Sequence, residues 1–385
     1  MIYSLKMPSA VTAGSGCVEE LENILAVRNA RNVLVCTDKG IGASGLLKGV
    51  MEILDRQPHV GSCILDTLAT EPSYQDVQAA LDSLGENRPD LIIAIGGGSV
   101  MDAAKLFSVL IGAEYTVKDL LEDPKRARKQ VRTVMIPTTC GTGSEATCNA
   151  IVAVPEKSVK MGIVSNEMIP DYVLLDPEML RKLPPRIVAA TGVDALAHVV
   201  ECYTSNKATP LSDIFAMEGA KRIFHNLVEA YRNPDNMEAK EAVLIGAFCG
   251  GAAITGSGTT AVHALSYPLG GKYHIPHGIS NAILFAPVME VNRGACTEQL
   301  ARLCDGVYPE YIEATQEEKA DQIIGKIQEI VEQVEIPTDL GGYGVTAADM
   351  EFLVRAGSEQ KRLLNNNRKA LTLEEIRGIY EKVVK

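Results

Sequence analysis

A carboxylate and an imidazole stand four residues apart in the segment TGVDALAHVVE, at Asp194 and His198. Residues with this spacing share one face of a helix, so the two side chains can bind one metal ion. An ordinary Asp–His pair on a helix surface has the same spacing. The pair therefore indicates a metal site only if further ligands reach it from elsewhere in the chain.

The segment AVHALSYPLGGKYHIPHG holds three of the chain's six histidines. His263 and His277 lie on either side of a proline and two glycines that turn the chain sharply. If this segment docks against the first helix, Asp194, His198, His263 and His277 form a set of three imidazoles and one carboxylate. Such a set suits Fe(II), Zn(II), Ni(II) or Cu(II), and four protein ligands with an open position are typical of a catalytic site. His274 is an alternative or additional participant.

A glycine-rich turn follows an apolar run in DLIIAIGGGSVMDAAK. Glycines such as Gly97 and Gly98 let the backbone approach a phosphate closely, and the helix that begins near Ser99 offers free N–H groups. A tight strand-to-helix connection without any ligand has the same composition. This turn by itself favours nucleotide binding no more than it favours a simple connection.

A second turn, MIPTTCGTGSEAT, carries hydroxyls at Thr138, Thr139, Thr142 and Ser144. They could donate hydrogen bonds to phosphate oxygens or to a nicotinamide amide. Helix-capping Ser and Thr in a hydrophilic turn would explain one or two of them, but not so many. Two such turns after parallel strands fit the rule that ligands bind beyond the carboxyl ends of the strands.

Asp38 follows the apolar run NVLVC. A carboxylate just past a strand can accept hydrogen bonds from both hydroxyls of an adenosine ribose, and it repels a 2′-phosphate, which favours NAD over NADP. An ordinary turn aspartate before a Lys-Gly pair would look the same. Both interpretations stand at this point.

Secondary-structure elements must position these residues, and the sequence pattern in the first half of the chain predicts such elements. Short apolar runs at 32–36, 90–98 and 133–137 read as strands, and amphipathic patterns at 73–87 and 100–112 read as helices. Strands that alternate with helices imply βαβ units and a parallel sheet. After Pro184 and Pro185 the pattern becomes helix upon helix. We therefore expect an α/β domain over 1–183 and an all-helical domain over 184–385.

Composition excludes several classes of protein. The 385 residues carry a formal net charge of −12, which disfavours nucleic acids and anionic membranes as partners. The basic run at 125–132 reads as a solvated face. No run approaches ~20 uninterrupted apolar residues, so no membrane span is expected. Nine scattered cysteines and an N-terminus without an export pattern predict a cytoplasmic protein with reduced thiols.

Taken together, three segments resemble one family. GGGSVMDAAK is similar to its glycine-turn motif, PTTCGTGSEAT to its second loop, and ATGVDALAHVVE with HALSYPLGG and HGISNAI to its metal signature. The chain resembles the group III iron-containing alcohol dehydrogenases, a family that includes lactaldehyde reductase and 1,3-propanediol dehydrogenase. The resemblance runs from TDKGI to the C-terminal LLNNNRKALTLEEIRGIY.

The resemblance implies a dinucleotide-binding α/β domain with a parallel sheet, an all-α metal-binding domain and a cleft between them, as in dehydroquinate-synthase-like architecture. It implies NAD and Fe(II) as cofactors, with Zn(II) possible in place of iron, and a short primary alcohol, diol or aldehyde as substrate. It implies a homodimer or a larger homo-oligomer. The implied metal ligands are Asp194, His198, His263 and His277. The implied cofactor residues are Asp38, Gly97, Gly98, Ser99, Asp102, Thr138, Thr139, Thr142, Ser144, Asn149, Lys160 and Leu180.

One departure from the family bears on proton transfer. The family commonly carries a second histidine four residues after the third ligand, and this chain has Tyr267 there. A tyrosine hydroxyl can pass a proton, but its ordinary pKa of about 10 makes it a weaker relay near neutral pH. Tyr267 and His274 are accordingly the candidate relay residues.

Two other functions share features with a metal-dependent alcohol dehydrogenase. A dehydroquinate-synthase-type cyclase also uses NAD and a metal, but it would need several Lys or Arg side chains for a sugar phosphate, and the stretch between His263 and His277 offers only Lys272. A non-catalytic scaffold of the same fold would be expected to have a broken ligand set, whereas all four ligand residues are present.

Overall fold

The computed structural model describes residues 2–157 and 159–385. Its internal contacts divide the chain into two compact units. The sheet unit consists of residues 6–139 and 143–183, and the helical unit consists of residues 184–385, the N-terminal residues through Leu5 and the segment 140–142. The sequence analysis treated 1–183 as one domain, whereas two short pieces of that range make their contacts with the helical unit.

A six-stranded sheet lies at the centre of the sheet unit within the described residues, with the order β1-β8-β5-β4-β2-β3. All neighbouring strands run parallel, which confirms the predicted α/β class. The strands are β1 (Ala10–Ala13), β2 (Asn32–Cys36), β3 (Gly61–Leu65), β4 (Leu91–Gly96), β5 (Arg132–Pro137) and β8 (Tyr172–Leu175).

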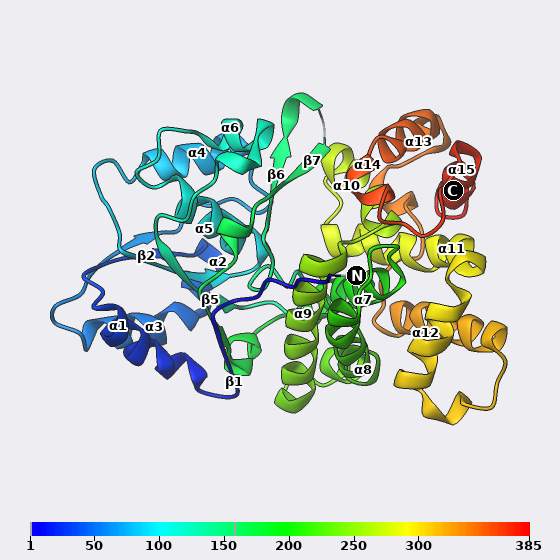
Figure 1. The fold of residues 1–385 in the computed structure, drawn as a ribbon, viewed down its shortest axis with the longest axis horizontal. Helices are drawn as coiled ribbons and strands as arrows, with labels where there is room; N and C mark the ends of the chain where they lie inside the picture. The colour runs from blue at the N-terminus through cyan, green and yellow to red at the C-terminus, as the bar shows by residue number, and fades with distance from the viewer. Residues whose placement is uncertain (1, 158) are drawn as a thin grey trace. The chain divides into compact units, whose positions relative to one another are not determined.

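The central strands are mostly apolar because helices cover both faces of the sheet. Side chains alternate between the two faces along a strand, and on one face Val33, Val35 and Ile93 pack in a cluster with helices α1 (Leu21–Arg28) and α3 (Leu46–Asp55). Helix α5 (Gly98–Leu110) contacts β4 and β5, and it lies across the sheet from α1 and α3 in Figure 1.

A second, two-stranded antiparallel sheet follows β5, formed by β6 (Asn149–Val154) and β7 (Val159–Val164). The sequence analysis did not predict this hairpin. The other elements of the sheet unit are short and connect strands: η1 (Cys17–Glu20), α2 (Lys39–Ser44), α4 (Tyr74–Asp82), α6 (Val117–Glu122), η2 (Pro124–Arg126), η3 (Pro155–Lys157), η4 (Asn166–Met168) and η5 (Pro177–Leu180).

The helical unit contains only helices and turns in the part that the structure describes, as predicted. Its long helices pack in sequence, with α7 against α8 and α8 against α9, and α11 packs against both α7 and α12. The helices are α7 (Pro185–Thr204), α8 (Pro210–Arg232), α9 (Met237–Ser257), α10 (Ala261–Tyr273), α11 (His277–Val307), η6 (Pro309–Tyr311), α12 (Gln316–Gln333), η7 (Gly341–Tyr343), η8 (Ala347–Asp349), α13 (Met350–Ser358), α14 (Lys361–Leu364) and α15 (Leu373–Glu381).

Helix α9 is long and apolar enough to cross a membrane by length and composition alone. Of its most apolar window, 67% is buried inside the protein, and the helix packs against α7 and α8. Packing in the core therefore accounts for its apolar character.

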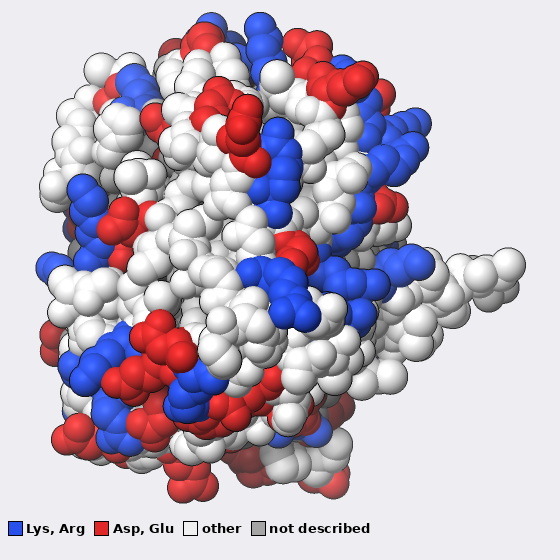
Figure 2. All heavy atoms as spheres, turned by 90° about the vertical axis from the view of Figure 1, so that its left-hand side faces the viewer, with Lys and Arg blue, Asp and Glu red and all other residues white. Residues whose placement is uncertain are grey.

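Charged side chains of both signs are interleaved on the face of the molecule that Figure 2 shows, without a continuous basic area on that face. The basic run at 125–132 is partly neutralised by its neighbours: Arg126 pairs with Asp119 at 2.8 Å, and Arg132 pairs with Asp171 at 2.8 Å. This run forms η2 and the start of β5, and its ion pairs fit a solvated face.

Candidate active site

Helix α7 carries two of the predicted metal ligands on one face. Pro185 occupies its first turn, where a missing N–H costs no helical hydrogen bond, and the helix then continues through Asp194 and His198. Both side chains are buried. Glu201 lies on the same face one turn further on and is fully buried. The face that the spacing predicted is thus directed into the interior of the helical unit.

The other two predicted ligands lie at the starts of two further helices. His263 is in the first turn of α10, and His277 is the first residue of α11. The close approach of α11 to α7 depends on Gly278, because a Cβ atom there would lie 2.1 Å from the carbonyl oxygen of Ala190. A glycine directly after His277 therefore allows its imidazole to reach the face of α7.

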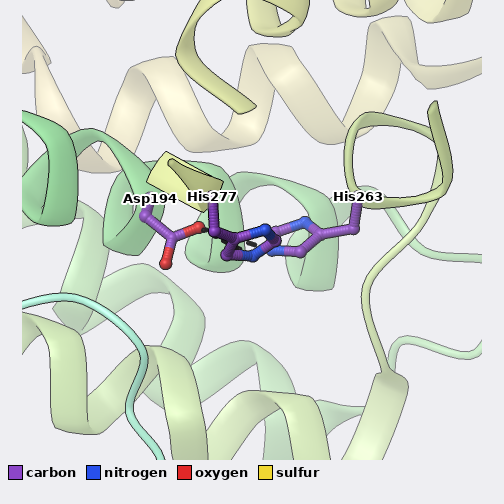
Figure 3. A group of neighbouring side chains, drawn as sticks. All are labelled: Asp194, His263 and His277. Atoms are coloured by element: carbon purple, nitrogen blue, oxygen red, sulfur yellow. Dashed lines mark ion pairs between the residues drawn. The ribbon is translucent and has the colours of Figure 1, made fainter. Parts of the chain in front are cut away.

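Three of the predicted ligand side chains, those of Asp194, His263 and His277, converge (Figure 3), and His198 lies beside them. Oδ1 of Asp194 lies 3.6 Å from Nε2 of His263, 3.5 Å from Nε2 of His277 and 4.0 Å from Nε2 of His198. The Nε2 atoms of His198 and His263 are 2.9 Å apart. Ligand atoms about 2.1 Å from a tetrahedral ion lie about 3.4 Å from one another, so these separations suit one metal ion.

The charge of this cluster also fits a divalent cation. Asp194 and Glu201 are both buried carboxylates. Burial by itself would raise the pKa of Asp194, but the imidazoles of His198, His277 and His263 hold it well below its usual range. Burial likewise acts to raise the pKa of Glu201, and His263 is the main group that lowers it. Two buried carboxylates carry a charge of −2 when both are ionised, and a divalent cation would balance that charge.

The two buried imidazoles respond to this environment in opposite directions. Burial lowers the pKa of His198. For His263, burial also acts to lower the pKa, but the carboxylates of Glu201 and Asp194 outweigh it and raise the pKa to about 9. A proton on His263 would also be shared with Nε2 of His198, 2.9 Å away. A metal ion would take the place of that proton.

Two residues at this cluster were missed by the sequence analysis. Glu201 faces Nδ1 of His263, and Nδ2 of Asn281 lies 2.6 Å from Oδ1 of Asp194 and 3.2 Å from Nε2 of both His263 and His277. Helical spacing could have found both of them. Glu201 follows Asp194 by two helical turns, and Asn281 follows His277 by one.

The two candidate relay residues differ in position. Tyr267 is buried one turn after His263, and its ring centroid lies 6.1 Å from that of His277. His274 ends α10 in a left-handed conformation with φ of 54° and is exposed. Within residues 2–157 and 159–385, no hydrogen bond or ring contact joins His274 to the ligand cluster. The geometry therefore favours Tyr267 over His274.

In the sheet unit, the two predicted turns adjoin at the carboxyl ends of neighbouring strands. Gly97 caps the N-terminus of α5 after β4, and Gly98 and Ser99 form its first turn. The backbone N–H of Thr138, after β5, donates to the carbonyl of Gly96 at 3.0 Å, and a Cβ on Gly97 would lie 3.4 Å from the methyl of Thr139. The two turns lie together beyond the carboxyl ends of β4 and β5, where ligands of open parallel sheets typically bind.

Several other predicted cofactor residues have structural contacts of their own. Oδ1 of Asp38 accepts from the backbone N–H of Ile41 at 3.0 Å and caps α2. Nζ of Lys160, on β7, lies 2.6 Å from Oε1 of Glu71, whose backbone N–H donates to Oγ of Ser99 at 3.1 Å. These contacts place Lys160 and Ser99 in one connected group.

The remaining predicted cofactor residues lie in four places. Asp102 and Ser144 are hydrogen-bonded to each other, and Asn149 begins β6. Leu180 is buried at the end of η5. Thr142 belongs to the segment 140–142 of the helical unit.

Comparison with known proteins identifies relatives along nearly the whole chain. A family model described as iron-containing alcohol dehydrogenase matches residues 8–177, and one described as the C-terminal part of the Fe-containing alcohol dehydrogenase family matches residues 188–384. Long-chain-alcohol dehydrogenase 1 of Geobacillus thermodenitrificans is 33% identical over 383 residues, which cover 99% of this chain and 96% of that protein.

Solved structures agree with these matches. A crystal structure of 1,3-propanediol oxidoreductase superposes with a TM-score of 0.92 at 26% identity and covers 99% of both chains. Sulfoacetaldehyde reductase from Bifidobacterium kashiwanohense, solved in complex with NAD+, superposes with a TM-score of 0.89 at 26% identity and covers 99% of this chain and 98% of that chain.

Proposed function

The chain belongs to the iron-containing alcohol dehydrogenase family, and from that premise we propose that it exchanges a hydride between NAD(H) and a small alcohol or its aldehyde. The observation that carries this proposal is the convergence of Asp194, His263 and His277, with His198 beside them, from three helices. An oxidoreductase that uses a Lewis acid needs such a set of protein ligands.

Asp194, His198, His263 and His277 would hold Fe(II), with Zn(II) possible in its place. When bound there, such an ion polarises the carbon–oxygen bond of the substrate. The protein keeps three of the four ligand side chains away from bulk water, since Asp194, His198 and His263 are each at most 5% exposed. Burial of the ligands strengthens every electrostatic interaction within the centre.

The glycine turn at the start of α5 would hold the cofactor pyrophosphate. α5 has 13 residues, so its N-terminus carries a full positive dipole end, and its first free N–H groups belong to Gly98 and Ser99. NAD, when bound, takes up or returns the hydride at its nicotinamide ring. The complex of sulfoacetaldehyde reductase with NAD+ supports this cofactor. The other residues proposed to surround it are Asp38, Gly97, Asp102, Thr138, Thr139, Thr142, Ser144, Asn149, Lys160 and Leu180.

Tyr267 would move the proton that accompanies hydride transfer. Its side chain is 5% exposed and lies one turn after His263 and beside His277. A hydroxyl at this position can exchange a proton with a substrate oxygen over a hydrogen bond. His274, which is exposed, would act only through intervening water.

The substrate proposed is a short primary alcohol, a diol or the corresponding aldehyde. No arginine is among the residues assigned to the site, which disfavours a dianionic substrate. The family matches are to alcohol dehydrogenases, and they give no support to the cyclase alternative. The intact ligand set is contrary to what a non-catalytic scaffold predicts.

A cytoplasmic location and a homodimer or larger homo-oligomer are also proposed, on the strength of the sequence. Nine cysteines without a paired spacing pattern fit a reducing compartment, and none of them forms a disulfide in the described part of the chain. Neither nucleic acid nor a membrane is expected as a partner, given the net charge of −12.

The test is NADH oxidation by anaerobically purified, Fe(II)-loaded protein with aldehydes of increasing chain length. We expect turnover that is lost on chelation and restored by Fe(II). The chain length of the aldehyde that is reduced fastest would indicate the size of the substrate pocket. A parallel assay with NADPH tests whether Asp38 makes the protein prefer NAD over NADP. The absence of turnover over the whole panel in metal-replete protein would contradict the proposal.

A further inference from the structure

Glu201 is a buried carboxylate that adjoins the proposed metal ligands without being one of them. Its side chain is 0% exposed, and it lies on the same face of α7 as Asp194 and His198. A fully buried carboxylate is costly unless every lone pair is used, so its partners indicate why it is there.

Within the described residues, the hydrogen-bond partners of the Glu201 carboxylate come from the start of α10. Its Oε1 accepts from the backbone N–H of Thr260 at 3.0 Å, from Oγ1 of Thr260 at 2.7 Å and from the backbone N–H of Val262 at 2.8 Å. Its Oε2 faces Nδ1 of His263. One carboxylate therefore satisfies unpaired N–H groups of the first turn of α10 and also holds the ring of His263.

This arrangement determines which nitrogen of His263 carries a proton. An ionised carboxylate can only accept hydrogen bonds, so Nδ1 of His263 must donate one. In the neutral ring, Nε2 then keeps its lone pair, and Nε2 is the atom that lies 3.6 Å from Asp194 and 2.9 Å from His198. The lone pair thus faces the other ligands.

We propose that Glu201 is the positioning residue of the metal centre. It holds His263 in the tautomer that can bind a metal ion, and it supplies the second buried negative charge that a divalent cation neutralises. This inference rests on the proposed function, since it assumes that Asp194, His198, His263 and His277 hold a metal. A hydrogen-bonded carboxylate behind a ligand histidine typically raises metal affinity by about 10- to 100-fold.

Glu201→Gln is the variant that tests the proposal. An amide can keep its oxygen toward Thr260 and Val262, and then its NH2 group opposes the proton on Nδ1 of His263. If the amide group is flipped, its NH2 group instead faces the N–H groups of Thr260 and Val262 and the hydroxyl of Thr260. Either orientation places hydrogen-bond donors opposite each other in the interior. The unflipped orientation also favours the tautomer of His263 with a proton on Nε2, which cannot bind the metal through that atom.

Thr260→Val is the matched control. It removes the hydrogen bond from Oγ1 of Thr260 to the same carboxylate but leaves the contact of Glu201 with His263. If Glu201 serves only to hold α10 in place, both variants should lose stability and neither should lose metal affinity selectively. If Glu201 positions the ligand, only Glu201→Gln should weaken metal binding.

The measurements are Zn(II) and Co(II) affinity by chelator competition, the visible spectrum of the Co(II) protein, and thermal unfolding of each metal-free variant. We expect about 10- to 100-fold weaker binding and an altered Co(II) spectrum for Glu201→Gln, and binding within about threefold of the unaltered protein for Thr260→Val. Equal metal affinity of the unaltered protein and Glu201→Gln would overturn this inference alone. Failure of the unaltered protein to bind either metal would overturn the proposed function as well.

A second measurement does not depend on the folding of a variant. ¹⁵N-histidine NMR of the unaltered Zn(II)-loaded protein reports the protonation of each ring nitrogen, and triple-resonance experiments on the same protein assign the signals of His263. We expect a protonated Nδ1 and a metal-bound Nε2. A deprotonated Nδ1 would refute the positioning role even if no Glu201 variant could be purified.

Discussion

Nζ of Lys105 lies 2.8 Å from Oδ1 of Asp102, and the lysine side chain is completely buried. The same ammonium also donates to the carbonyl of Ser144 at 3.0 Å, to Oγ1 of Thr147 at 3.0 Å and to the carbonyl of Asn149. Asp102 in turn accepts from the backbone N–H of Ile151 at 2.9 Å. The pair therefore ties helix α5 to the turn that carries the hydroxyls after β5.

Replacement of Lys105 by methionine should destabilise the sheet unit strongly. The change leaves Asp102 without its buried counter-ion and leaves several backbone and hydroxyl acceptors unsatisfied, so we expect a loss of about 3–5 kcal/mol in the free energy of unfolding. Urea unfolding measures it. Lys118→Met, at an exposed position of α6, is the control and should change stability by less than about 0.5 kcal/mol. A similar small change for Lys105→Met would show that the pair is not structural.

Glu145 should make the stability of the protein depend on pH. Burial raises the pKa of its carboxyl to about 7 from 4.5. Between these two values the folded protein binds a proton that the unfolded chain has released, so stability falls as pH rises through this range, by roughly 3 kcal/mol in total. Glu145→Gln cannot ionise and should lose this part of the slope.

Urea unfolding of both proteins at pH 5 and pH 8 tests the sign. The stability difference between Glu145→Gln and the unaltered protein should shift in favour of the variant at pH 8. Glu114→Gln, at an exposed residue, is the control. A difference that is the same at both pH values would contradict the raised pKa.

His263→Ala should abolish metal binding and turnover while the protein remains folded. It removes a ligand from the centre of the cluster and also leaves Glu201 without a partner at Oε2. We expect metal content after dialysis to fall to the background level and the far-ultraviolet circular dichroism to be retained. His59→Ala, in an exposed loop, should behave as the unaltered protein. Full activity of His263→Ala would exclude the proposed ligand set.

Tyr267→Phe should slow turnover near neutral pH by about 100-fold if its hydroxyl is the proton relay. The ring and its packing beside His277 are kept, so only proton transfer is removed. Tyr267→His should restore much of the rate with an optimum at lower pH, because an imidazole titrates near 6.5 and a phenol near 10. The pH profile of kcat measures both effects. An unchanged profile in both variants would assign the relay elsewhere.

Asp38→Asn should shift cofactor preference toward NADPH without unfolding α2. Asparagine is as good an N-cap as aspartate, so the hydrogen bond to the backbone of Ile41 is kept while the negative charge is removed. We expect the ratio of kcat/KM for NADPH to that for NADH to rise by about 10-fold or more. The same change at exposed Asp66 is the control. An unaltered ratio would leave Asp38 as a helix cap only.

Local patterns in the sequence predicted the central elements well. The run NVLVC became β2 over Asn32–Cys36, and the run before the glycine turn became β4 over Leu91–Gly96. Strands that are buried on both faces must be apolar at every position, so they can be recognised without neighbours. The predicted helix at 100–112 began two residues earlier, at Gly98, because the last glycine of the turn and Ser99 already belong to its first turn.

The hairpin of β6 and β7 was not predicted. Burial alternates along β6 (Asn149–Val154), and this strand pairs with β7 rather than with a strand of the central sheet. A strand that is half exposed carries a weaker apolar signal, and its pairing depends on packing against α5 and α6 rather than on its own residues. The local sequence pattern was therefore insufficient to predict the β6–β7 hairpin.

The candidate metal ligands were accessible from sequence because two of them stand at helical spacing and the other two are histidines in one turn-rich segment. Asp194 and His198 are one turn apart on α7, and their face turned inward as expected. His263 and His277 were proposed from the turn-rich segment that holds them, on the condition that this segment docks against the first helix, and the family resemblance implied the same four ligands. The roles of these residues as ligands stay predictions until a metal is measured.

The sequence by itself determined the parallel sheet, the all-helical second half and the residue types of a metal centre, because these depend on local apolar periodicity and on short spacings. Only the tertiary structure decided that Glu201 faces His263, that Asn281 adjoins Asp194, and that Lys105 is buried against the turn after β5. The reason is physical: each of these polar side chains is buried, and what satisfies a buried polar group is a partner from another element, whose identity no local pattern records.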